Sequence, residues 1–302
     1  EYPTIFDILK KNGYSLHATI PNLTWFKQLT ESFDYVEEYD ALDDETRDTI
    51  FNSVGNKIIK KLNTMNYPWV FFTHIFDLHI PTKFDLEFSG SEFGQNRYDK
   101  SVSCIDSWLG KFLEKIDLKN TIIIITSDHG EIIPKVEFDV PLQTTKKFMK
   151  SIKKRIPALE PLGVKIYEKM SHDAHLKRIE TDSRGLDNEE KRTLITRGLV
   201  DLVHDDLIHI PLIIHTPDNI EKDISQLTRQ VDISPTILEI LNLKFDDMID
   251  GKSLLPLIQG NIVEEEPAYI ESGSNKPDKL GKFIGIRTSK FKYMRSRGMM
   301  TP

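Results

Sequence analysis

The run Thr121-Ile-Ile-Ile-Ile-Thr126 constrains the fold more than any other feature of this sequence. It has the length of a strand, and its inner positions offer no polar side chain that could face water. It therefore predicts a strand that is buried on both faces. Strands of this kind occur in parallel sheets that helices cover on both sides. We therefore expect an α/β structure in which this run is one of the strands.

Strand and helix patterns alternate on either side of this run. The other strand patterns are Leu16–Ile20, Trp69–Phe76 and Ile208–His215. Apolar residues at helical steps mark Thr4–Lys11, Leu42–Leu62, Tyr98–Ile116 and Ser234–Leu241, and Ser234 is the expected N-cap of the last helix. Such alternation predicts a mostly parallel central sheet with helices on both faces.

The composition changes twice along the chain. Residues 1–260 carry the alternating pattern, but within them about 135–200 are rich in Lys, Arg and Glu, which predicts an exposed helical insertion. Residues 261–302 contain the short strand patterns Ala268–Ile270 and Phe283–Thr288 with a turn-rich link between them. We interpret 1–260 as one α/β domain and 261–302 as the start of a small antiparallel appendage.

Bulk properties narrow the classes of partner. The chain has 302 residues and a formal net charge of −7, which argues against a dedicated nucleic-acid binder because that role needs a dominant positive field. Its single cysteine, Cys104, lies on a helix stripe and is expected in the core. No apolar run approaches the ~20 residues that span a bilayer. On these residues a soluble, cytoplasmic protein is favoured, with an export signal upstream of residue 1 left open.

Polar, ligand-capable side chains follow the run Thr121–Thr126 directly. Asp128 and His129 are adjacent, and Gly130 allows a sharp turn that lets both side chains face one ion. A carboxylate beside an imidazole suits Mn²⁺, Zn²⁺ or Mg²⁺, and Ca²⁺ if more carboxylates complete the shell. The ordinary alternative is a strand-end turn in which Asp128 caps the next segment.

Other histidines offer weaker candidates. His79 follows Asp77 beyond the strand pattern Trp69–Phe76, where an imidazole can contact an anionic substrate. A surface loop histidine is the ordinary alternative. His204 precedes the last strand pattern of the sheet. His74 lies inside an apolar run and is expected to be buried and hydrogen-bonded, whereas His172 and His175 are expected on a solvated face.

Seven segments, in this order, resemble the sulfatase family of the alkaline phosphatase superfamily. They are Phe71–Pro81, Tyr98-Asp99 with Ile105-Asp106, Asn120–Glu131, Asp205–Ile214, Val231–Leu238, Asp250–Pro256 and Arg287–Tyr293. The resemblance implies an alkaline phosphatase-like fold and one divalent metal ion (Ca, Mn, Mg or Zn) held by Asp128 and His129. It also implies that His79 is the catalytic residue that binds the anionic group of a small ester substrate, with His204 as a second substrate-binding candidate.

The chain departs from the family pattern at three places. Leu78 stands where members usually carry Pro in Asp-Pro-His, and Ile132–Lys135 replaces the usual Leu-Gly-His-like continuation. Members also carry a nucleophile, formylglycine made from Cys or Ser, in a Cys/Ser-x-Pro-x-Arg motif near the N-terminus, together with an Asp pair. Neither occurs here. The opening Tyr2–Tyr14 resembles the helix after that region, so we expect the nucleophile upstream of residue 1.

The resemblance leaves three functions open. The first is metal-dependent hydrolysis of sulfate esters. The second keeps the fold with a phosphorus substrate, as in a phosphodiesterase, a phosphonate monoester hydrolase or a phosphoglycerol-type transferase. His129, where many calcium sulfatases carry Asn, leans toward this group or toward a manganese enzyme. The third is a non-catalytic binding protein that has lost the nucleophile. The oligomeric state is open.

Overall fold

The computed structural model describes residues 3–41, 43, 46–79, 82–131, 203–218, 221–244, 249–272 and 283–296. The chain divides into two compact units, which are described separately. The first comprises Glu1–Thr126, Pro211–Tyr269 and Ile286–Tyr293, and the second Ser127–Ile210, Ile270–Gly285 and Met294–Pro302. The expected insertion at 135–200, with His172 and His175, lies outside the described residues.

A three-stranded parallel sheet with the order β2-β1-β3 forms the centre of the first unit. Its strands are β1 (Ser15–Pro21), β2 (Tyr35–Tyr39) and β3 (Trp69–Thr73). In the register, Ala18 of β1 lies opposite Val36 on one side and Phe72 on the other. The two further strands β4 (Ile123–Thr126) and β5 (Leu212–His215) pair antiparallel in a second sheet. The prediction that Thr121–Thr126 is buried on both faces within a parallel sheet is therefore wrong: residues 123–125 are half-buried and Thr126 is exposed, because this sheet has only two strands in the part of the chain that the structure describes.

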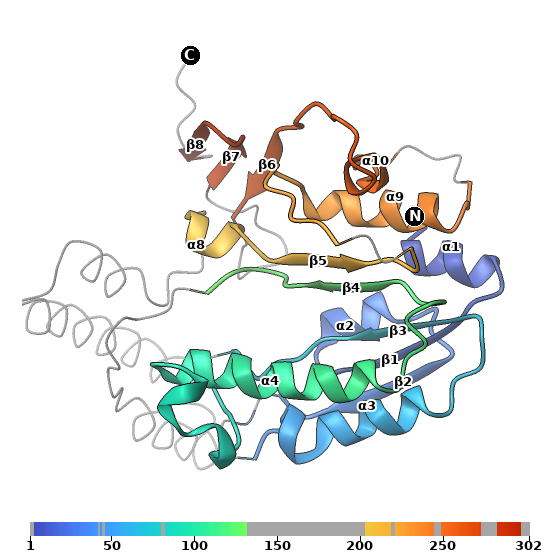
Figure 1. Ribbon diagram of the computed structural model, residues 1–302, viewed down its shortest axis with the longest axis vertical. Coiled ribbons are helices and arrows are strands. Elements are labelled where there is room, and N and C mark those ends of the chain that lie inside the picture. Colours follow the sequence, from blue (N-terminus) through green and yellow to red (C-terminus); the bar gives the residue numbers. More distant parts are fainter. Residues whose placement is uncertain are drawn as a thin grey trace, which may run out of the picture. The chain divides into compact units, whose positions relative to one another are not determined.

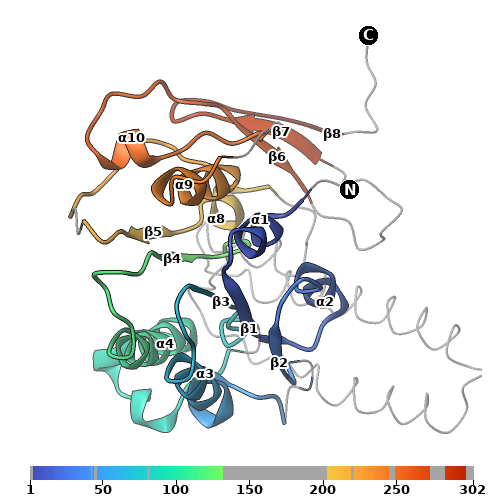
Figure 2. The same cartoon turned by 90° about the vertical axis from the view of Figure 1, so that its right-hand side faces the viewer.

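Helices cover the parallel sheet on both faces, as the alternating pattern predicts (Figure 1, Figure 2). They are α1 (Ile5–Lys11), α2 (Thr24–Leu29), the π-helical turn η1 (Ile50–Val54), α3 (Gly55–Leu62) and α4 (Arg97–Leu113). Phe71 of β3 packs against the cluster that η1, α3 and α4 build. Its neighbour Phe72 faces the other way and packs against Phe26 of α2 and Phe6 of α1. The α/β fold class is therefore confirmed.

The helix predicted at Leu42–Leu62 has the expected buried face, but the prediction of its first residue is wrong. Ile50, Val54, Ile58 and Leu62 are all buried, as their spacing at steps of four predicts. The helical segment begins at Ile50 and not at Leu42, because a capping box closes its N-terminus. Thr49 accepts a hydrogen bond from the Asn52 backbone N–H, and the Asn52 side chain accepts one from the Thr49 N–H.

The long helix α4 confirms the core position of Cys104, which is 1% exposed. The buried side of the helix runs through Cys104, Trp108 and Phe112, whereas Val102 of the predicted stripe is 42% exposed. Two short 3-10 turns precede the helix, η2 (Leu86–Phe88) and η3 (Ser91–Phe93). None of the helices in the described ranges has the length and apolar character needed to cross a bilayer.

The remaining elements follow β4. They are α8 (Asp205–Ile208), β5, η5 (Gln230–Asp232), α9 (Ile233–Ile240), α10 (Leu255–Ile258), β6 (Ala268–Glu271), β7 (Phe283–Arg287) and β8 (Lys292–Ser296). The last three form a small sheet in the order β6-β7-β8, which confirms the C-terminal antiparallel appendage. The expected N-cap at Ser234 is wrong, because α9 begins at Ile233 and its cap residue is Asp232.

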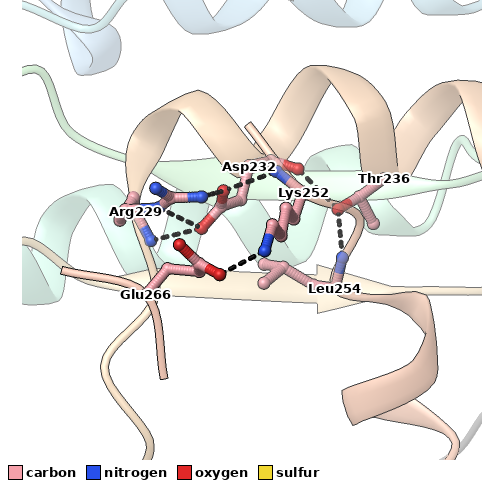
Figure 3. A network of polar contacts seen from close by, with 6 residues as sticks. All are labelled: Arg229, Asp232, Thr236, Lys252, Leu254 and Glu266. Atoms are coloured by element: carbon pink, nitrogen blue, oxygen red, sulfur yellow. Dashed lines mark hydrogen bonds and ion pairs between the residues drawn. The ribbon is translucent and has the colours of Figure 1, made fainter. Parts of the chain in front are cut away.

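A network of polar contacts joins the start of α9 to the segment before α10 (Figure 3). Both carboxylate oxygens of Asp232 accept hydrogen bonds from Arg229, and Oδ1 also accepts the Lys252 backbone N–H at 2.9 Å. Thr236, which has no exposed surface, donates to the Asp232 carbonyl and accepts the Leu254 N–H at 2.8 Å. Buried polar groups are thus paired across about 20 residues of chain.

We expect Thr236→Val to lower the free energy of unfolding by about 1–3 kcal/mol, because the Leu254 N–H then stays buried without an acceptor. Thr236→Ser keeps the hydroxyl and loses one methyl group, at a cost of about 1 kcal/mol. Urea denaturation of both variants and amide exchange at Leu254 measure the difference. A Thr236→Val protein as stable as the wild type would contradict this account of the network.

Candidate active site

The turn after β4 places the Asp128 and His129 side chains beside each other. The His129 backbone N–H donates to Asp128 Oδ1 at 3.0 Å, and His129 Nε2 lies 3.8 Å from Asp128 Oδ2. Both side chains are well exposed, His129 at 58% and Asp128 at 63%. The carboxylate and the imidazole are therefore neighbours that both remain open to a ligand.

A further hydrogen bond decides which nitrogen of His129 is available. His129 Nδ1 lies 2.7 Å from the Gly130 carbonyl oxygen. A carbonyl oxygen only accepts, so this contact is a hydrogen bond only when Nδ1 carries the proton. The lone pair then lies on Nε2, the nitrogen nearer to Asp128. Histidines that bind metals commonly donate their other ring N–H to a carbonyl or carboxylate in the same way.

The two side chains fit a divalent cation as part of a coordination shell. Neutral imidazole and carboxylate are donors that Mn²⁺, Zn²⁺ and Mg²⁺ accept. Among the residues that the structure describes, no group of three or more His, Cys, Asp or Glu side chains is arranged to hold an ion. The assignment of Asp128 and His129 as metal ligands stays a prediction.

Gly130 ties this turn to the helix α8 within the second unit. The Gly130 N–H donates to the Leu207 carbonyl at 2.8 Å, and a Cβ added at Gly130 would lie 2.0 Å from the Asp206 carbonyl oxygen. His204 is the cap residue of α8, and its half-buried side chain makes no capping hydrogen bond. The structure therefore brings the segment of His204 against the turn of Asp128 and His129. Its role in substrate binding stays a prediction.

His79 belongs to the first unit and lies in a turn after β3. Its backbone N–H donates to the Phe76 carbonyl at 3.0 Å, and its exposed imidazole stacks on the Phe76 ring with centroids 4.5 Å apart and an angle of 13°. An imidazole held flat against a ring and open to solvent can meet an anionic group. The catalytic and substrate-binding roles assigned to His79 are not tested by this geometry.

Asp77 points away from the surface, although it lies only two positions before His79. It is 2% exposed, and its Oδ1 accepts the Ile50 backbone N–H at 2.9 Å. Burial raises the pKa of Asp77 to about 6, although the Ile50 N–H and the positive charge of Arg47 act in the opposite direction. Asp77 therefore anchors the turn and does not present its carboxylate to solvent.

Arg47 is a residue that the sequence pattern missed. It is 2% exposed, and its Nη2 donates to the His79 carbonyl at 3.3 Å. Nothing in the periodicity of the segment distinguishes it from a surface arginine, since a buried charge leaves no apolar pattern. The sequence does contain a local signal for the helix start two residues later. Thr49 forms a capping box there, which places Arg47 in the non-helical stretch before the helix.

His74 is half-buried as part of the wall of the core. Its ring lies 4.7 Å from that of Phe26, and its carbonyl accepts a hydrogen bond from the Tyr39 hydroxyl at 2.5 Å. The expectation of a buried His74 is thus met only in part, since its ring packs against Phe26 but the residue is half-buried, and the hydrogen bond from Tyr39 is to its backbone and not to its imidazole.

Two protein-family models match the chain, and both describe sulfate-ester or sulfamate hydrolases by name. The family model described as Sulfatase matches residues 1–243, and the model described as N-sulphoglucosamine sulphohydrolase, C-terminal, matches residues 199–299. No curated protein sequence matches the chain significantly.

Solved structures share the fold at low sequence identity. The phosphonate monoester hydrolase of Agrobacterium radiobacter is similar with a TM-score of 0.61 and 13% identity over 98% of this chain and 72% of that one. Ps i-CgsB gives a TM-score of 0.56 at 13% identity, over 97% of this chain and 67% of that one. BT1596, a 2-O GAG sulfatase, gives a TM-score of 0.51 at 14% identity, over 97% of this chain and 64% of that one. These likenesses concern the fold alone.

We expect Gly130→Ala to disrupt the turn that carries Asp128 and His129, because the new methyl group would collide with backbone and not with a flexible side chain. Collisions of this kind cost about 1–3 kcal/mol or more. The matched control is Gly110→Ala on α4, where a Cβ meets nothing within 4 Å and the helix gains about 0.5–1 kcal/mol. Thermal unfolding and limited proteolysis of both variants check this, and an equally stable Gly130→Ala protein would contradict it.

Proposed function

This chain belongs to the sulfatase family of the alkaline phosphatase superfamily, and from that premise we propose that it serves the metal-dependent hydrolysis of sulfate esters. The observation that carries the proposal is the geometry of the turn after β4. Asp128 and His129 lie side by side, and the Gly130 carbonyl holds His129 in the tautomer that leaves Nε2 free to bind a cation.

In this function Asp128 and His129 hold a divalent ion, and His79 binds the anionic group of the substrate. A bound ion would supply positive charge that stabilises the negative charge developing on the sulfuryl oxygens. It would also lower the pKa of an oxygen nucleophile. The His79 imidazole would donate a hydrogen bond to a non-bridging oxygen of the ester and so stabilise negative charge there. In the same proposal His204 contributes to the substrate surface, because the helix α8 that it caps contacts the turn of Asp128 and His129.

Chemistry on phosphorus is the second candidate. The observation that favours it is His129 itself, because many calcium sulfatases carry Asn where this chain carries an imidazole. Nitrogen ligands favour transition metals such as Mn²⁺ or Zn²⁺ over Ca²⁺. A phosphonate or phosphate ester has the same tetrahedral, anionic shape as a sulfate ester, so the same side chains would meet it.

The test measures metal content and turnover in the natural full-length protein. Aryl sulfate, a sulfated sugar, a phosphate monoester, a phosphodiester and a phosphonate monoester are offered in parallel. We expect a stoichiometric divalent ion and turnover of sulfate esters above the phosphorus substrates. Faster turnover of a phosphonate or phosphodiester would favour the second candidate, and a protein that binds no metal and turns over nothing would instead be a binding protein.

We expect Asp128→Asn and His129→Gln each to lose the bound ion and to lower turnover by at least about 10- to 100-fold, the range that even outer-shell changes reach. Asp218→Asn is the matched control, since Asp218 is also an exposed aspartate in a turn after a strand. Elemental analysis reads metal loss independently of activity. Retention of the ion in both site variants would overturn the assignment of these ligands.

A further inference from the structure

The turn Phe76–His79 is anchored on its buried side by polar groups that have no role in the proposed chemistry. Its outer side presents the stacked imidazole of His79. Its inner side presents Asp77, whose carboxylate accepts the Ile50 N–H at the N-terminus of η1. Negative charge is stabilised at such a terminus, where backbone N–H groups lack partners within the helix. The turn is therefore anchored to a helix that starts 27 residues earlier in the chain.

A second contact ties the end of the same turn to the same segment. Arg47 lies three residues before Ile50, and its guanidinium donates to the His79 carbonyl at 3.3 Å. The segment 47–50 thus contacts the turn both at Asp77 and at His79. Tyr39 adds a third contact just before the turn, where its hydroxyl donates to the His74 carbonyl at 2.5 Å. Together these contacts leave the backbone of 74–79 little freedom to move.

Burying these polar and charged groups costs free energy, so a contribution to stability alone does not explain the arrangement. Arg47, Asp77 and Tyr39 are each 2% exposed. Removing two charges from water costs several kcal/mol per ion, and apolar residues of similar volume are often as stable or more stable in their place. A buried polar network can instead contribute conformational specificity, because its hydrogen bonds form only when the partners have one relative position. That geometry belongs here to the turn that carries His79.

We propose that Arg47 and Asp77 are positioning residues for His79, which tie its turn to the start of η1 and thereby fix the direction in which the imidazole meets the substrate. The proposal rests on the proposed function of His79 for its consequence in catalysis. Neither Arg47 nor Asp77 contacts the substrate in this account. Their effect is transmitted through the His79 carbonyl and through the backbone of the turn.

The position of the imidazole can be read directly by NMR. Protons of the His79 ring lie over the face of Phe76 and are shifted upfield by its ring current. They are assigned by their disappearance in His79→Gln, and Phe76→Leu gives the value without the ring current. This measurement needs a folded protein but no activity, so it tests the positioning even if the proposed function fails.

The variants distinguish the loss of the Arg47 and Asp77 contacts from the effect of leaving one buried charge without its partner. Arg47→Met alone leaves the Asp77 carboxylate buried without its nearby positive charge and can unfold the protein. The combined variant Arg47→Met with Asp77→Leu removes both charges and keeps the volume filled. Asp77→Asn is the conservative variant, because its side-chain oxygen can still accept the Ile50 N–H. Thr236→Val controls for a general loss of stability at a site in another part of the fold.

We expect the combined variant to lose at least half of the ring-current shift of His79, and Asp77→Asn and Thr236→Val to retain it. In the natural full-length protein, kcat for the best ester should fall about 10- to 100-fold in the combined variant with the bound metal unchanged, since small misplacements of a catalytic group have effects of this size. In a His79→Gln background the same two substitutions should lower kcat no further.

Two results would overturn the proposal. One is a full ring-current shift in the folded combined variant, which would show that the imidazole does not need Arg47 and Asp77. The other is an equal fall in kcat with and without His79, which would place their effect elsewhere. If the wild-type protein hydrolyses none of the esters, the proposed function fails, and the ring-current shift alone decides the positioning.

Discussion

The packing of β3 against apolar clusters on both of its faces is the constraint on which the first unit depends. Phe71 and Phe72 are neighbours in sequence and point to opposite sides of the sheet, one into the cluster with Trp108 and Ile58, the other into the cluster with Phe26. A strand packed on both sides cannot rotate or slip by one residue without moving apolar side chains out of both cores. The direction and the end of β3 are therefore fixed, and with them the point at which the turn of His79 begins.

Buried polar contacts determine how segments far apart in sequence are joined. Asp77 accepts the Ile50 N–H across 27 residues, and Asp232 accepts the Lys252 N–H across 20. In each case a carboxylate that is nearly inaccessible to solvent meets backbone donors that would otherwise lack a partner. Apolar packing brings these elements together but tolerates many arrangements, whereas hydrogen bonds of fixed length select one.

The turn after β4 shows how few local contacts fix the arrangement of the Asp128 and His129 side chains. Gly130 lets the backbone approach α8 more closely than any residue with a Cβ could, and its carbonyl holds the Nδ1 proton of His129. The same glycine thus serves both the packing of the turn and the state of the imidazole.

The sequence by itself determined the α/β class, the places of the main strands and helices, the core position of Cys104 and the sulfatase resemblance, because periodic apolar residues and short motifs are local properties. It missed β2, a polar edge strand, and it began the second helix at Leu42, before the cap at Thr49. The antiparallel pairing of β4 with β5 and the burial of Arg47 and Asp77 were decided only by the tertiary structure. A charged side chain is buried when partners from distant segments satisfy it, and no local pattern records where those partners will be.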